Sequence, residues 1–168
     1  KHYQEKYDVT EEDIAHVVVK AYANGNRNPL AHMREVKVDL ESASNAGDRN
    51  PRFLRNEEYK EYLKVTDCSQ VSDGGAAVIL ASEEGLKKLG KSAEDCIEVL
   101  SYGVAANPLG DVDDFTELGT TKKAAAEVYE DAGIDPDEVN VCEVHDCFAV
   151  TEVLMYEALG FAEAGQGA

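Results

Sequence analysis

The chain has 168 residues, enough for one domain with a buried core. Its formal net charge of -18 excludes nucleic acid as a partner, because phosphates would be repelled over most of the surface. Its apolar runs stay short of the roughly 20 residues that a membrane-spanning helix needs, so we expect a soluble protein that does not contact a membrane.

The four cysteines are scattered through the sequence without C-x-x-C spacing, which predicts neither a zinc site nor a disulfide framework. We therefore expect no bound metal and a reducing compartment, the cytoplasm. The polar start KHYQEKYDVTEED does not resemble a signal peptide.

The first predicted element is an amphipathic helix with Thr10 as its N-cap, followed by three acidic residues that the helix dipole stabilises. Asn24 and Gly25 predict its end. One helical face carries its apolar residues, Ile14, Val17, Val18, Ala21 and Tyr22.

From Gly25 to Asn56 the sequence has no sustained period, which predicts a long irregular region of the kind that is usually functional or a subdomain. Residues 20–60 hold eight basic and six acidic side chains, whereas the rest of the chain is strongly acidic. The basic side chains either bind an anion such as a nucleotide phosphate or are ordinary solvated surface; the sequence leaves both open.

Residues 57–63 are expected to form a short helix or the segment that leads into the next element. The turn at 72–74 then precedes an apolar run at 76–81, AAVILA, which predicts an interior strand. Ser82 is the expected N-cap of the next helix, which buries Leu86 and Leu89 and ends at Gly90.

Alternating apolar and polar residues at 97–104 predict another strand, which is followed by an acidic loop and then a helix at about 116–132. Gly133 is expected to end this helix, and a capping box at 135–138 predicts a single helical turn.

Near the end of the chain, β-branched residues at 139–144 predict a buried strand, and period 3.6 from Phe148 predicts a helix that ends at Gly160. His145 falls at the junction, where α/β proteins place ligands close to helix N-terminal N–H groups. The plainer interpretation is that Asp146 caps the helix and His145 is an ordinary loop residue.

Three motifs carry a resemblance to a known family. The run EVHDCF at 143–148, followed by YEALG at 156–160 and GQG at 165–167, closely resembles the thiolases of the sterol-carrier-protein type. DCSQVSDGGAA at 67–77 is similar to that family's D-C-x-x-x-S-D-G-A-A-A segment, with Gly75 in place of alanine. NPLA at 28–31 is similar to its N-P-Y-A stretch, with Leu30 in place of an aromatic residue.

The resemblance implies the thiolase-like α/β fold, a mixed sheet with helices on both faces. Under it, residues 1–64 form the end of a loop domain that binds coenzyme A, 65–92 the last strand and helix of the N-terminal half, and 93–168 the first part of the C-terminal half. The family's nucleophilic cysteine loop, G-H-P loop and C-x-G loop have no match in this sequence, so the chain by itself is expected to be inactive.

The resemblance also implies an acyltransferase that makes or cleaves 3-ketoacyl-CoA, with coenzyme A or acyl-CoA as substrate and no tightly bound cofactor. His145 matches the family's catalytic histidine, whose ring N–H stabilises negative charge on the thioester oxygen. Ser69 is a weaker candidate for a contact with the pantetheine arm, an ordinary loop hydroxyl being about as good an account. Cys142 and Cys147 match no nucleophile motif.

The expected assembly is a homodimer or homotetramer. The alternative function is a non-catalytic thiolase-like subunit that binds acyl-CoA or supports a partner such as an OB-fold protein.

Overall fold

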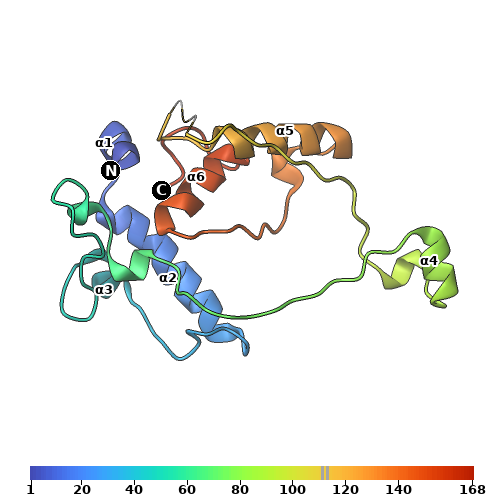
Figure 1. Cartoon of the computed structure of the whole chain (residues 1–168), viewed down its shortest axis with the longest axis horizontal. Coiled ribbons are helices and arrows are strands. Elements are labelled where there is room, and N and C mark those ends of the chain that lie inside the picture. Colours follow the sequence, from blue (N-terminus) through green and yellow to red (C-terminus); the bar gives the residue numbers. More distant parts are fainter. Residues whose placement is uncertain (111, 113) are drawn as a thin grey trace.

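The computed structural model describes residues 1–110, 112 and 114–168. Asp111 and Asp113, in the predicted acidic loop, lie outside the described residues. Figure 1 shows the described α-helices and the long connections between them. The helices are α1 His2–Tyr7, α2 Glu11–Arg27, α3 Leu40–Ser44, α4 Glu83–Lys88, α5 Gly119–Ala132 and α6 Ala149–Ala158. Short 3-10 turns lie at Lys60–Tyr62, Val65–Asp67, Ala93–Asp95 and Pro136–Glu138.

The predicted start of α2 is confirmed, and its end lies two residues beyond Gly25. The Thr10 hydroxyl accepts from the Asp13 N–H at 3.2 Å, and the Asp13 carboxylate accepts from the Thr10 N–H at 2.7 Å, which completes a capping box. Glycine costs a helix only about 1 kcal/mol, so Gly25 does not by itself stop it. The Asn26 amide, which donates to the carbonyls of Arg34 and Val36 at 2.8 Å each, ties the last turn to the following loop.

The core lies where α2 packs against α3 and α6. Ala15 and Val18 of α2, Ala43 of α3 and Val153 of α6 are all at most 2% exposed. Removing such apolar side chains from water stabilises the packing by about 25 cal/mol per Å². The amphipathic stripe predicted for α2 is therefore confirmed, and its partners are helices.

A buried charge network fixes the loop region onto the start of α2. The Lys64 side chain is 2% exposed, and its ammonium lies 3.1 Å from both the Glu11 and the Asp67 carboxylates. Arg52 donates to the other Glu11 oxygen at 2.6 Å and pairs with Glu61 at 3.1 Å. Removing Lys64 would leave the buried Asp67 carboxylate without an ion-pair partner, so this network fixes the position of residues 64–68 on α2.

The predicted sheet is not confirmed in the described part of the chain. The stretches 76–81, 97–104 and 139–144 are extended but form no ladder, and only isolated bridges are present, at Gly47–Asn50, Arg52–Lys64 and Cys68–Phe148. Ile79, predicted to be interior, is 88% exposed, and Val141 is 81% exposed. A strand requires a neighbouring strand for its N–H and C=O groups, and no segment among the described residues forms a backbone ladder with these three.

Several helix boundaries follow the predicted signals and others do not. Ser82 caps α4 by accepting from the Gly85 N–H, but Leu89, predicted to be buried, is 63% exposed. Figure 1 shows why: α4 lies far from the other helices, at the end of two extended segments, so none of the described helices covers it. Helix α1 was not predicted because its few residues are mainly polar.

Left-handed glycines end two of the predicted helices. Gly133 has φ +66° after α5, and Gly160 has φ +79° after α6, a conformation that other residues adopt only with strain. The helical turn predicted at 135–138 is also confirmed, since the Glu138 carboxylate accepts from the Asp135 N–H at 2.8 Å. Within the described residues, no helix combines the length and apolarity needed to cross a bilayer.

Candidate functional site

Two of the three sequence motifs are joined by backbone contacts, although about 80 residues separate them. The Ser69 N–H donates to the Cys147 carbonyl at 3.0 Å, and Cys68 forms an antiparallel bridge with Phe148. The 67–77 motif therefore lies against the junction that leads into α6. Because backbone hydrogen bonds fix the two segments together, residues of one have a defined position relative to the other.

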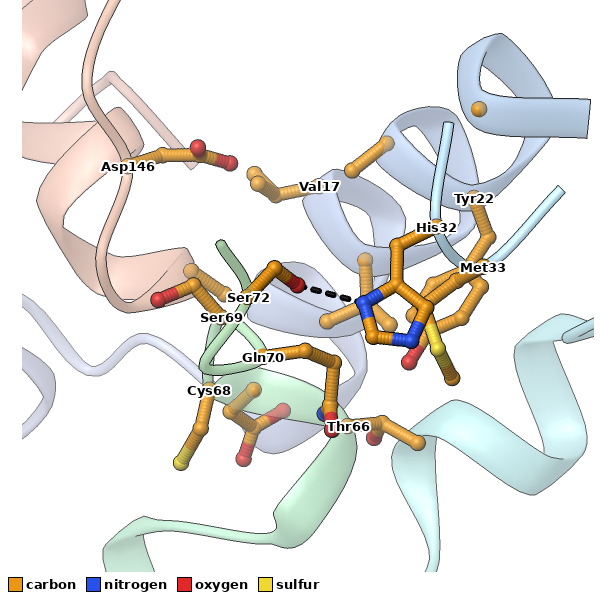
Figure 2. Close-up of a pocket in the computed structure, with 15 residues that line it drawn as sticks. Val17, Tyr22, His32, Met33, Thr66, Cys68, Ser69, Gln70, Ser72 and Asp146 are labelled. Carbon is orange, nitrogen blue, oxygen red and sulfur yellow. Dashed lines mark hydrogen bonds between the residues drawn. The ribbon is translucent and has the colours of Figure 1, made fainter. Parts of the chain in front are cut away.

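The third motif reaches the same place through the residue that follows it. His32, immediately after NPLA, shares a hydrogen bond between its ring Nδ1 and the Ser72 hydroxyl (Figure 2). The NPLA turn is itself ordered, since the Asn28 side chain accepts from the Leu30 N–H at 2.9 Å. Two motifs, and the residue that follows the third, thus meet around one space.

That space is a cavity of about 300 Å³ between one face of α2 and the motif loops. Val17, Val18 and Tyr22 of α2 and Met33 supply an apolar wall, while Ser69 and Ser72 supply hydroxyls. Figure 2 shows the polar residues around the His32 ring and Asp146 on the opposite side. The cavity is also lined by Ala21, Gly25, His32, Thr66, Asp67, Cys68, Gln70, Asp146 and Ala149. An apolar cavity with a few converging polar groups is the usual form of a small-molecule site.

The predicted site residues occupy different positions relative to this cavity. Ser69 lines it. His145 is exposed and does not line the cavity. The next residue, Asp146, does line it. The predicted cap role of Asp146 is wrong: α6 begins after Phe148, and no side-chain cap hydrogen bond forms there.

Cys68 is on the cavity wall, and its thiol is mainly protonated at neutral pH. Burial, and then the negative charge of Asp67, raise the pKa of its thiol to about 11. The thiol also points its hydrogen toward the Lys64 carbonyl, with 3.4 Å between the sulfur and the oxygen. A thiol that is protonated at neutral pH is a poor nucleophile, so the cavity contains no activated cysteine among its lining residues.

Two of the arginines in residues 20–60 already form ion pairs within the chain. Arg52 is held by Glu11 and Glu61, and Arg34 by Glu35 at 3.0 Å and the Pro29 carbonyl at 3.2 Å. Arg27, Arg49 and Arg55 are exposed and form no ion pair within the described ranges. These three therefore remain the arginines available to an anion.

Sequence reasoning missed His32, Thr66 and Asp67 as cavity residues. His32 and Asp67 directly adjoin or belong to the motifs, a signal that could have singled them out. Their convergence depends on the loop path, which no sequence period describes. No group of three or more metal-ligating side chains is present in the part of the chain that the structure describes.

Comparisons with known proteins find relatives in the family that the motifs resemble. The family model for a thiolase C-terminal domain-like region covers residues 101–168. Sterol carrier protein 2 of Homo sapiens is 31% identical over all of this chain and 29% of its own length. Benzoylsuccinyl-CoA thiolase subunit BbsB of Thauera aromatica is 32% identical over 98% of the chain and 40% of its own length. Acetyl-CoA acetyltransferase of Methanothermobacter thermautotrophicus is 30% identical over 96% of this chain and 39% of its own length.

Among solved structures, one titled Ltp2-ChsH2(DUF35) aldolase has a TM-score of 0.75 and 21% identity, over 98% of this chain and 41% of its own. That likeness shows a shared fold. The chain spans less than half the length of each of these relatives. The matches extend over nearly the whole sequence and include the three motifs, and they show that the chain belongs to the thiolase family, as a partial chain similar to the sterol-carrier-protein type.

Proposed function

We propose that the protein to which this chain belongs is a coenzyme A-dependent acyltransferase that makes or cleaves 3-ketoacyl-CoA. The observation that carries the proposal is the meeting of two motif segments, and of His32 after the third, around one apolar cavity. The names of two relatives, an acetyl-CoA acetyltransferase and a benzoylsuccinyl-CoA thiolase subunit, point to the same substrate class.

In this proposal His145 donates a ring N–H to the thioester oxygen when that oxygen gains negative charge. The bridge between Cys68 and Phe148 and the hydrogen bond from Ser69 to Cys147 hold the junction that bears His145 beside the cavity. His145 is exposed, and we propose that its ring meets a thioester at the cavity edge. A donor placed in advance stabilises developing charge without reorganisation, which is worth about 2.7–4 kcal/mol in known oxyanion holes.

Ser69 is proposed to contact the pantetheine arm, because it lines the cavity next to this junction. Arg27, Arg49 and Arg55 are proposed for the phosphates of coenzyme A, since they are the arginines without internal ion pairs in the described ranges. The cysteine that accepts the acyl group must come from outside these 168 residues, because no match to the family's nucleophile loop occurs in them. We also propose that the protein lies in the cytoplasm, a reducing compartment that fits its four free cysteines. We propose that it forms a homodimer or homotetramer.

The test is cleavage of acetoacetyl-CoA by the intact gene product. His145→Ala is expected to lower the rate about 10²–10³-fold, because one oxyanion donor is lost. His16→Ala is the matched control: His16 is an exposed imidazole on α2 that does not line the cavity, and its loss should leave the rate unchanged. An unchanged rate in His145→Ala would refute the catalytic role of His145.

The second candidate is a non-catalytic thiolase-like subunit that binds acyl-CoA or supports a partner such as an OB-fold protein. Two observations favour it: His145 does not line the cavity, and one relative is named as a subunit. Purified intact protein that binds acetyl-CoA in calorimetry but shows no turnover alone would favour this candidate. Full turnover by the protein alone would exclude it.

A further inference from the structure

A buried carboxylate lies where α6 contacts α2. The Glu152 side chain is 4% exposed, pairs with the Lys20 ammonium of α2 and accepts from the Tyr156 hydroxyl. The Lys20 ammonium also donates to the Tyr156 oxygen at 2.8 Å and lies 5.4 Å from the centre of its ring. These three side chains, the Lys20 cluster, contain the one ion pair between α2 and α6 in the part of the chain that the structure describes.

The Lys20 cluster lies one helical turn from the 300 Å³ cavity on both helices. On α2, Val17 lines that cavity three residues before Lys20. On α6, Ala149 lines it three residues before Glu152. Residues three apart are neighbours on a helix surface, so the cluster adjoins the cavity without lining it.

The segments on both sides of His145 meet the Lys20 cluster. Before His145, Val141 and Val144 line a second cavity, of about 260 Å³, together with all three cluster side chains. After His145, α6 itself carries two of those side chains. Burial, and then the negative charge of Asp146, raise the pKa of Tyr156, so its hydroxyl stays a donor at neutral pH. The turn that carries His145 is therefore attached to the cluster at both ends.

The burial of Glu152 makes this attachment depend on Lys20. A carboxylate without a cation is costly to bury, and without Lys20 it gains solvation only if the start of α6 shifts toward water. His145 precedes α6 by four residues, so such a shift moves its ring. A displacement of about 1 Å at a reacting group can lower a rate by about 10²-fold.

We propose that Lys20, Glu152 and Tyr156 are positioning residues that hold His145 in place for the reaction. This inference rests on the proposed function. Because none of the three side chains lines the 300 Å³ cavity, they act through His145 and not through substrate binding.

The test is cleavage of acetoacetyl-CoA by the intact gene product, at a temperature where circular dichroism shows each variant folded. Lys20→Met keeps the side-chain length and removes the charge, and it should lower kcat about ten- to hundredfold with little change in KM. Lys20→Arg keeps a cation beside Glu152 and should retain most of the rate. The control is Lys88→Met, which breaks the exposed ion pair with Glu84 on α4 and should leave kcat unchanged.

A double-mutant cycle separates positioning from a general loss of structure. In a His145→Ala background, Lys20→Met should have little further effect on kcat, because the donor that Lys20 positions is already absent. An unchanged kcat in Lys20→Met, or the same fold loss in both backgrounds, overturns the inference and leaves the proposed function intact.

Hydrogen exchange gives a readout without substrate. The Ser69 N–H, which donates to the Cys147 carbonyl, and the amides at 151–155 should exchange faster in Lys20→Met than in the wild type. Amides of α4, which lies away from the other helices, should exchange equally in both and serve as the internal control. Unchanged exchange at Ser69 and at 151–155 overturns the inference alone, and intact wild-type protein without turnover overturns both it and the proposed function.

Discussion

Cys68 shows how the cavity environment sets the chemistry of a single residue. Its thiol pKa is raised to about 11, chiefly by burial, so the protonated form persists well above neutral pH. We expect iodoacetamide to alkylate Cys68 far more slowly at pH 8 than the exposed Cys96 and Cys142, with a rate that keeps rising up to about pH 11. Peptide mass spectrometry after timed labelling measures all three. Equal labelling at pH 8 would contradict the assigned environment.

A second prediction at this scale concerns Glu152, a buried carboxylate on α6. It pairs with the Lys20 ammonium of α2 and accepts from the Tyr156 hydroxyl, and its side chain is 4% exposed whereas that of Lys20 is 48% exposed. Lys20→Met should lower the free energy of unfolding by about 1–3 kcal/mol, because it leaves a buried carboxylate with one neutral donor.

Glu152→Gln provides the comparison for that prediction. It keeps the shape and removes the buried charge, and the released Lys20 is exposed enough to be solvated, so we expect a smaller loss. Urea denaturation of the two variants gives the order. The opposite order would show that Lys20 contributes little to holding α2 against α6.

At the scale of elements, the cap of α2 is the clearest link between sequence and stability. Thr10→Ala should cost about 1 kcal/mol, because it removes one of the two capping-box hydrogen bonds, whereas Thr10→Ser should retain most of the stability. Thermal unfolding monitored by circular dichroism measures both variants. No loss in Thr10→Ala would mean that packing alone sets the start of α2.

The same cap predicts a pH dependence. The Thr10 hydroxyl and backbone N–H lower the pKa of Asp13 below its usual 3.8. A carboxyl whose pKa is lowered by folding stabilises the folded state above its unfolded pKa, and this contribution disappears as the pH falls through the folded pKa. The stability difference between wild type and Thr10→Ala should therefore shrink below about pH 4. A constant difference down to pH 2 would contradict this coupling.

On the scale of the whole molecule, the extended segments at 76–81, 97–104 and 139–144 lack the neighbouring strands that a sheet requires. Val78, Ile79 and Leu80 are 80–88% exposed and form no sheet ladder. The relatives are more than twice as long as this chain, so we expect the rest of a thiolase-length protein to supply the neighbouring strands. Exposed runs of this kind otherwise promote association.

Hydrogen exchange tests this expectation directly. Amides 76–81 should exchange within seconds in the 168-residue chain by itself and be protected in the intact gene product, because ladder hydrogen bonds slow exchange. Amides of α6, which are hydrogen-bonded within the helix, should be protected in both and serve as the internal control. Fast exchange at 76–81 in the intact protein would show that this run is not a strand there.

Local signals in the sequence determined several helix boundaries and the family. Thr10, Ser82, Gly133 and Gly160 mark starts and stops because capping and left-handed turns depend on residues within four positions of one another. The motifs identified the thiolase family for the same reason, since each is a short contiguous run.

Only the tertiary structure decided the cavity and the state of the predicted strands. The meeting of His32 with Ser72 and of Ser69 with Cys147 joins residues 40 and 78 positions apart, which no local period encodes. The apolar run at 76–81 and the alternating stretch at 97–104 have the composition of strands, but a strand exists only when another segment accepts its hydrogen bonds. Helices satisfy their backbone within themselves, whereas sheets and cavities require partners that are distant in the sequence.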